Sequence, residues 1–291
     1  MVRKIHLVTI DPQNSFCKIV DALQQQLIHD GELCVPGAWD DMLRLADLVD
    51  RLSHKLDDIH VTMDSHHYLH IAHPYWFKDT KGARPDPFTV MRNEKGTIIG
   101  AKYDATGTLH DVGQYTTVQP GLLKWTLDYL AALTTGGRYP HMIWPPHCLI
   151  GSPGHNIVQP LFDAFLRWET TSCGFVNYVT KGSNYRTEHF SAVRAEVPDP
   201  GDNSTQLNSK LIGIVMEADI ILLAGEASSH CLANTVRDMA NSFADDSFIK
   251  KCVLLTDATS AVGGLEFLEK QFIQEMTARG MQLSTTKDFL A

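Results

Sequence analysis

Residues Leu222–Ala240, LLAGEASSHCLANTVRDMA, decide the fold of this chain. They begin inside an apolar run, break at Ala224-Gly225, and resume with apolar residues at helical spacing. The stretch therefore predicts a strand, a tight turn and a helix. Cys231 stands at the expected helix start, where free N–H groups and the helix dipole favour a thiolate and could stabilise an oxyanion. The alternative is a small, buried, chemically inert cysteine.

The same alternation of strand and helix runs along the rest of the chain. Apolar patterns predict strands at 4–10, 59–63, 175–180, 219–223 and 252–255. They predict helices at 39–52, 122–133, 156–170, 207–217 and 265–280, besides the one that begins at Cys231. This order predicts an α/β fold with a doubly wound, mostly parallel sheet flanked by helices.

The domain organisation is expected to be simple. With 291 residues, the chain is long enough for one α/β domain spanning 1–291. The segment 82–140 is rich in glycine, proline, aspartate and threonine, and we expect an insertion there that lies over the core. Because loops this long are usually functional, we expect it to cover the ligand pocket or to build a subunit contact.

Composition and charge narrow the class of partner. Hydrophobic residues make up 44% of the chain and charged residues 20%, as in soluble globular proteins. A net charge of -9 argues against nucleic acid and anionic membranes, and no apolar run approaches the 18 residues of a membrane span. The six cysteines are scattered without a CxxC pair, which favours reduced thiols and a cytoplasmic protein. We also expect a homo-oligomer.

Four reactive side chains each follow a predicted strand directly: Asp11, Asp64, Lys181 and Cys231. The carboxyl ends of parallel strands lie at one edge of a sheet, where ligands bind, so all four should converge there. Asp64 and His66 are two residues apart and would point the same way if the strand continued, as two ligands of a metal site would. This convergence favours a catalytic role for Cys231.

Six blocks of sequence together resemble the nicotinamidase/pyrazinamidase family of the isochorismatase-like cysteine hydrolases. The blocks are DPQNSF (11–16), GELCVPG (31–37), DSH (64–66), WPPHCLIGSPG (144–154), KGSNYRTEHFSA (181–192) and GEASSHC (225–231). The match runs from residue 5 to about 260, apart from roughly 82–140.

The resemblance implies a role for each matching residue. It makes Asp11, Lys181 and Cys231 a catalytic triad, and it places an oxyanion hole at Ala227 and Cys231 after a cis peptide between Glu226 and Ala227. It makes Asp64, His66 and His147 metal ligands, with Glu188 as a further acid linked to the metal, and Phe16, Trp144 and Phe190 pocket walls. The implied metal is divalent, with zinc first and iron or manganese as alternatives.

The activity implied is the deamidation of nicotinamide to nicotinate and ammonia through a cysteine thioester. The sequence departs from the family pattern at Ser15, Ser229 and Phe190 and in the long insertion, so another small amide, carbamoyl or ureido compound is the alternative substrate. An isochorismatase would lack Cys231 and the metal ligands. A binding module without catalysis is the third reading, and the complete triad argues against it.

Overall fold

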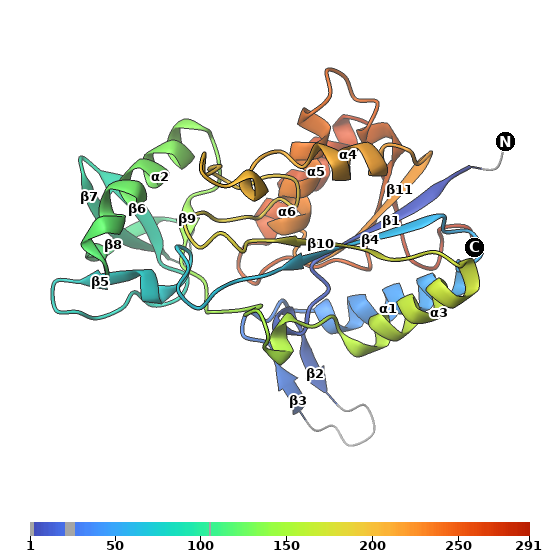
Figure 1. Cartoon of the computed structure of the whole chain (residues 1–291), viewed down its shortest axis with the longest axis horizontal. Coiled ribbons are helices and arrows are strands. Elements are labelled where there is room, and N and C mark those ends of the chain that lie inside the picture. Colours follow the sequence, from blue (N-terminus) through green and yellow to red (C-terminus); the bar gives the residue numbers. More distant parts are fainter. Residues whose placement is uncertain (1–2, 21–26, 105) are drawn as a thin grey trace.

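A six-stranded parallel sheet lies at the centre of the chain, of which the computed structural model describes residues 3–20, 27–104 and 106–291 (Figure 1). Its strand order is β10–β4–β1–β11–β12–β13. The strands are β1 (Ile5–Ile10), β4 (Asp58–Asp64), β10 (Asn177–Lys181), β11 (Ile220–Gly225), β12 (Cys252–Leu255) and β13 (Gln282–Ser284). All five neighbouring pairs are parallel, which confirms the predicted α/β fold.

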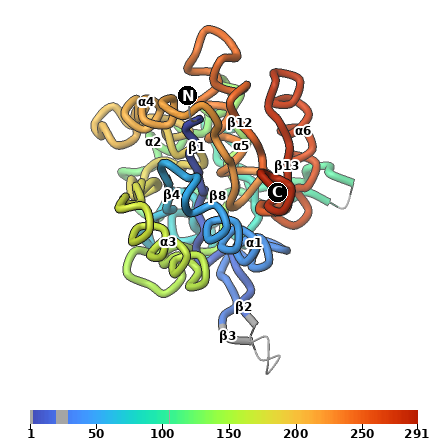
Figure 2. The backbone as a smooth tube through the Cα atoms, turned by 90° about the vertical axis from the view of Figure 1, so that its right-hand side faces the viewer, coloured from blue at the N-terminus to red at the C-terminus, as the bar shows by residue number. Residues whose placement is uncertain are grey.

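Helices cover both faces of this sheet. α1 (Ala38–Arg51) and α3 (Gln159–Ser172) lie side by side on one face, as both views show (Figures 1 and 2). α4 (Ser209–Val215), α5 (Cys231–Asn241) and α6 (Glu266–Ala278) lie on the other face. The central strands are rich in apolar residues because they are buried on both faces; all six residues of β1 are buried.

A second, antiparallel sheet lies beside the first and occupies residues 77–142. Its order is β5 (Phe77–Asp79), β8 (Leu109–Thr117), β7 (Thr97–Tyr103), β6 (Val90–Glu94) and β9 (His141–Met142). Helix α2 (Leu123–Thr135) packs on it around a separate apolar core that includes Trp76 and Tyr129. The sheet thus extends beyond the expected insertion, 82–140, at both ends.

The sequence patterns missed the strands of this second sheet, although they predicted helix α2. Strand β8 is mostly exposed and lacks a regular apolar face, so no period of two marks it. Strand β13, at the edge of the main sheet, was missed for the same reason. Strands β2 (Lys18–Val20) and β3 (Leu27–Asp30) form one more antiparallel pair. In the described residues no helix is long and apolar enough to cross a membrane.

Candidate active site

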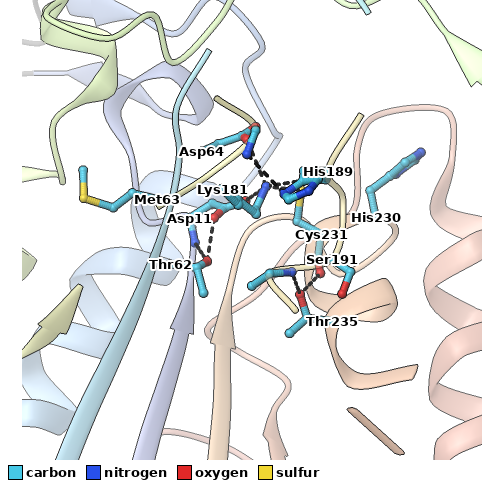
Figure 3. Close-up of polar contacts among 12 residues, drawn as sticks. Asp11, Thr62, Met63, Asp64, Lys181, His189, Ser191, His230, Cys231 and Thr235 are labelled. Carbon is cyan, nitrogen blue, oxygen red and sulfur yellow. Dashed lines mark hydrogen bonds and ion pairs between the residues drawn. The ribbon is translucent and has the colours of Figure 1, made fainter. Parts of the chain in front are cut away.

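The four side chains that were expected to converge do so at the carboxyl edge of the main sheet (Figure 3). The register pairs Lys181 with Asp64 on adjacent strands, while Asp11 directly follows β1 and Cys231 begins α5. Lys181 Nζ lies 2.8 Å from Asp11 Oδ2, 3.0 Å from Asp64 Oδ1 and 3.6 Å from Cys231 Sγ. All four side chains are buried, so the lysine lies at the centre of a buried polar cluster.

The charges in this cluster stabilise one another. Burial alone would lower the pKa of Lys181, but Asp11 and Asp64 outweigh it and raise that pKa well above its usual value. Burial alone would raise the pKa of Asp64, but His66 and Lys181 hold it well below the usual value. For Asp11 burial prevails and its pKa is raised. The resting site therefore holds a charged lysine and a charged Asp64.

The sequence led us to expect that the helix start would favour a thiolate at Cys231, but the surroundings of the thiol oppose this. Burial raises its pKa well above the ordinary value, although Lys181 pulls in the opposite direction. The helix start therefore does not make Cys231 a resting thiolate, and attack by the sulfur requires a base. Asp11 is placed for that role: its Oδ1 accepts a hydrogen bond from Thr62 Oγ1 (2.6 Å), and its carboxyl group also faces the thiol.

The turn between β11 and α5 presents unused backbone donors. The Glu226–Ala227 peptide is cis, which confirms the expectation drawn from the resemblance. Within the described residues, neither the Ala227 N–H nor the Cys231 N–H donates a hydrogen bond to the chain. Both residues line the same cavity, so these donors are available to a carbonyl oxygen placed beside the thiol.

That cavity is small and has aromatic walls. Phe16, Trp144 and Phe190 line it together with Cys231, as expected. The sequence reading missed His230, whose ring packs edge-on against Trp144 (centroids 5.3 Å apart) and Phe190 (5.2 Å). The position of His230 directly before the cysteine was the only available signal. The aromatic lining suits a small flat ring.

The predicted metal ligands meet beside the cavity. Asp64 Oδ2 lies 3.0 Å from His66 Nε2 and 3.3 Å from His147 Nε2. Nδ1 of His66 faces the Gly182 carbonyl (3.1 Å), and Nδ1 of His147 faces the Pro145 carbonyl (2.8 Å). Because a carbonyl only accepts, each Nδ1 carries a hydrogen, so Nε2 is the nitrogen that a neutral ring would offer to a metal. This donor set fits a divalent metal.

A third histidine, His73, belongs to the same group, and the sequence reading missed it. Ligating nitrogens of His66, His73 and His147 all lie within 4.8 Å of one another. His73 Nδ1 faces the Tyr68 carbonyl (3.2 Å), and its buried Nε2 has no partner in the described part of the chain. The run HHYLHIAH at 66–73, with four histidines in eight residues, was the available signal.

Glu188 lies close to this group, and its role as a metal-linked acid stays a prediction. It lines the cavity and is buried, and its Oε1 accepts a hydrogen bond from its neighbour's backbone, His189 N (2.8 Å). Its Oε2 finds no hydrogen-bond partner among the described residues.

The structure resembles solved hydrolases over nearly its whole length. A nicotinamidase/pyrazinamidase of Acinetobacter baumanii matches with a TM-score of 0.60 and 18% identity, covering 99% of this chain and 98% of that one. The yeast nicotinamidase matches with a TM-score of 0.58 and 17% identity over 96% and 99% of the two chains. An isochorismatase family protein of Desulfovibrio vulgaris matches with a TM-score of 0.50 and 16% identity over 99% and 96%.

The chain has the isochorismatase-like hydrolase fold. No protein-family model matches its sequence, and no curated protein matches it either.

Two polar residues near the start of this isochorismatase-like fold tie the site together. Gln13 Nε2 donates to the Asp64 carbonyl (2.8 Å), and the Asp64 N–H donates to Gln13 Oε1 (2.7 Å). Ser15, one of the departures from the family pattern, donates to Glu32 Oε2 (2.6 Å) and accepts from Cys148 N (2.8 Å). The Gln13 bonds hold the loop after β1 against the end of β4. The bond from Cys148 to Ser15 holds it against the loop that carries His147.

The segment 82–140 reaches the cavity wall through its end. The Tyr139 ring packs edge-on against His230, with centroids 5.4 Å apart. The preceding residue, Arg138, forms an ion pair with Asp238 of α5 (2.8 Å). The segment thus contacts a wall of the pocket from outside; its two expected roles, covering the pocket and building a subunit contact, stay predictions.

A second histidine–carboxylate group lies toward the opposite end of the strands and forms a chain of polar contacts. Asn177 Nδ2 contacts His60 Nδ1 (3.1 Å), and His60 Nε2 contacts His6 Nδ1 (3.2 Å). His6 Nε2 lies 3.4 Å from Asp58 Oδ2. Every ring nitrogen of this group therefore has a protein partner, in contrast to His73 Nε2.

Proposed function

We propose that the chain is a metal-dependent cysteine amidase that deamidates nicotinamide to nicotinate and ammonia. The observation that carries this proposal is Lys181 in contact with Asp11, Asp64 and Cys231, beside a small aromatic cavity. The structural neighbours agree with it: two are nicotinamidases, and a third, from L. infantum (18% identical, TM-score 0.53), was solved with nicotinate. The site offers a buried thiol and two free N–H groups, and this arrangement suits attack on an amide carbon.

A divalent metal ion would be held by Asp64, His66, His147 and His73, with zinc first and iron or manganese as alternatives. When bound, such an ion supplies a Lewis acid that can accept a lone pair from a ring nitrogen or from water. A pyrazinamidase of Pyrococcus horikoshii, which has the same fold (TM-score 0.51), was solved with zinc. The walls formed by Phe16, Trp144 and Phe190 would hold the ring by stacking and apolar contact.

The proton transfers would run through Asp11. The carboxylate takes the proton of the Cys231 thiol, and the sulfur attacks the amide carbon. The N–H groups of Ala227 and Cys231 stabilise the negative oxygen that forms. Protonated Asp11 then gives its proton to the amide nitrogen as the C–N bond breaks, which releases ammonia and leaves a thioester.

Hydrolysis of the thioester completes the cycle. Asp11, again a carboxylate, takes a proton from a water molecule that attacks the thioester carbon, and the C–S bond breaks. The acid leaves and the Cys231 thiol is restored with that proton. Lys181 stays charged throughout, since Asp64 and Asp11 raise its pKa, and it balances the negative charge that moves between sulfur and carboxylate.

Metal content tests the ligand set. We expect about one tightly bound divalent ion per chain, and we expect His147→Ala to lose it, because His147 Nε2 is one of the converging lone pairs. His73→Ala should weaken binding about 10- to 100-fold. The measurement is elemental analysis after dialysis against a chelator series. His67→Ala is the matched control, since His67 is exposed in the same loop. A metal-free preparation with full activity would refute the assignment.

The substrate is tested by steady-state kinetics on a panel. We expect ammonia release from nicotinamide and pyrazinamide with kcat/KM at least about 100-fold above that for aliphatic amides, since only the ring fills the aromatic cavity. Benzamide lacks the ring nitrogen, so its kcat/KM, compared with that of nicotinamide, measures what contact between this nitrogen and the metal contributes. Turnover of a ureido or carbamoyl compound without turnover of nicotinamide would preserve the amidase chemistry and reject this substrate.

A further inference from the structure

Two buried acids, Glu226 and Asp41, meet at the turn that carries the free N–H groups. Glu226, fully buried, precedes Ala227, and Asp41, 2% exposed, comes from the first turn of α1. Both carboxyl groups bind the same serine: Ser260 N donates to Glu226 Oε2 (3.2 Å) and Ser260 Oγ donates to Asp41 Oδ2 (2.5 Å). The two acids therefore lie close together, away from the metal ligands.

The surrounding groups compensate only one negative charge. Arg44 Nη2 donates to Asp41 Oδ1 (2.6 Å), so Asp41 has a cation. Glu226 Oε1 is buried and receives no hydrogen bond in the described part of the chain. The other titratable groups that face the pair are Cys17 and Glu269, and neither is positive. An ionised Glu226 would be an unpaired buried charge, which folded proteins avoid.

A protonated Glu226 carries no charge, so the unpaired buried charge does not arise. Its O–H donates to Asp41, which has acceptor capacity left, and its other oxygen accepts from Ser260 N. Burial, and next the charge of Asp41, raise the pKa of Glu226 well above its usual value. The pair would then carry one charge, matched by Arg44.

The main chain around Glu226 carries the donors proposed for catalysis. The Glu226 N–H donates to the Ile10 carbonyl (2.7 Å), and the Ser228 N–H donates to the Ser260 carbonyl (2.9 Å). Ala227 lies between these two anchors with its own N–H free. We propose that Glu226 is a positioning residue: its protonated carboxyl bridges Asp41 and Ser260 and holds the turn that directs the Ala227 N–H into the cavity. This role rests on the proposed amidase function.

The protonation of Glu226 in the folded chain can be tested without any substrate. A folded chain that keeps a proton on Glu226 loses stability as pH rises above the unfolded pKa, until the folded group ionises. In Glu226→Gln the amide replaces both hydrogen bonds and does not titrate. Above about pH 5.5, the folding constant of the wild type should therefore fall about tenfold per pH unit relative to that variant, until the folded Glu226 ionises.

The measurement is denaturant unfolding of the full chain at several pH values. Glu266→Gln, which changes an exposed carboxyl on α6, is the control and should follow the wild type. Parallel pH dependences of the wild type and Glu226→Gln would show an ionised Glu226 and overturn the proposal.

Positioning is tested by kinetics on whichever amide of the panel the wild type hydrolyses, so a wrong substrate does not count against Glu226. Glu226→Leu, similar in volume but without hydrogen bonds, should lower kcat at least about 30-fold with little change in KM, because the oxyanion donor matters most in the transition state. Glu226→Gln should keep kcat within about threefold. Full kcat in a folded Glu226→Leu protein, or equal losses in both variants, would overturn the role.

Discussion

Cys231→Ala is expected to lower kcat by at least about 10³-fold while the fold is kept. The sulfur lies 3.6 Å from Lys181 Nζ, at the start of α5 and beside the free N–H of Ala227. An alanine methyl group fits the same space and suits a helix, but it cannot attack a carbonyl carbon. Steady-state kinetics with circular dichroism on the same sample measure both parts of the prediction.

The matched control is Cys252→Ala. Cys252 is also fully buried, in the neighbouring strand β12, but it does not line the cavity. The variant should lose some stability and keep kcat within about threefold, because only packing changes. Near-normal turnover in a folded Cys231→Ala protein would refute the nucleophile assignment.

The convergence of the four reactive residues could be predicted because it depends on topology. A parallel sheet brings the ends of its strands to one edge, and Asp11, Asp64 and Lys181 each stand at or directly after a strand end. The strands themselves could be found because each contains enough apolar residues to mark it in the sequence. No pattern finer than strand and helix order was needed to place these side chains together.

Other parts of the site depend on tertiary packing, which has no sequence period. His73 joins the metal group because the short turn at Pro74–Trp76 places its ring beside His147. Glu226 looks like an ordinary turn residue until α1 brings Asp41 to it. The raised pKa of Cys231 is likewise a consequence of burial, whereas the sequence showed only a helix start.

Asp11→Asn should lower kcat/KM about 10³-fold, and it should do so without making the thiol less reactive. Asparagine can neither take the proton of Cys231 nor deliver one to the departing amide nitrogen. The negative charge of Asp11 is also one of the causes that raise the pKa of the Cys231 thiol, after burial. Its removal beside a charged Lys181 should therefore lower that pKa and increase the thiolate fraction at neutral pH.

Turnover and alkylation of Cys231 are thus expected to move in opposite directions. The rate of iodoacetamide labelling, followed by peptide mapping because Cys173 is exposed, should rise in Asp11→Asn at each pH tested. Thr62→Val is the control: it removes the hydrogen bond to Asp11 Oδ1 (2.6 Å) but keeps the carboxylate, so the loss should stay near tenfold. Unchanged turnover in Asp11→Asn would exclude Asp11 as the base. A parallel fall in labelling would instead mean that the site had collapsed, since a missing base alone leaves the sulfur free to react.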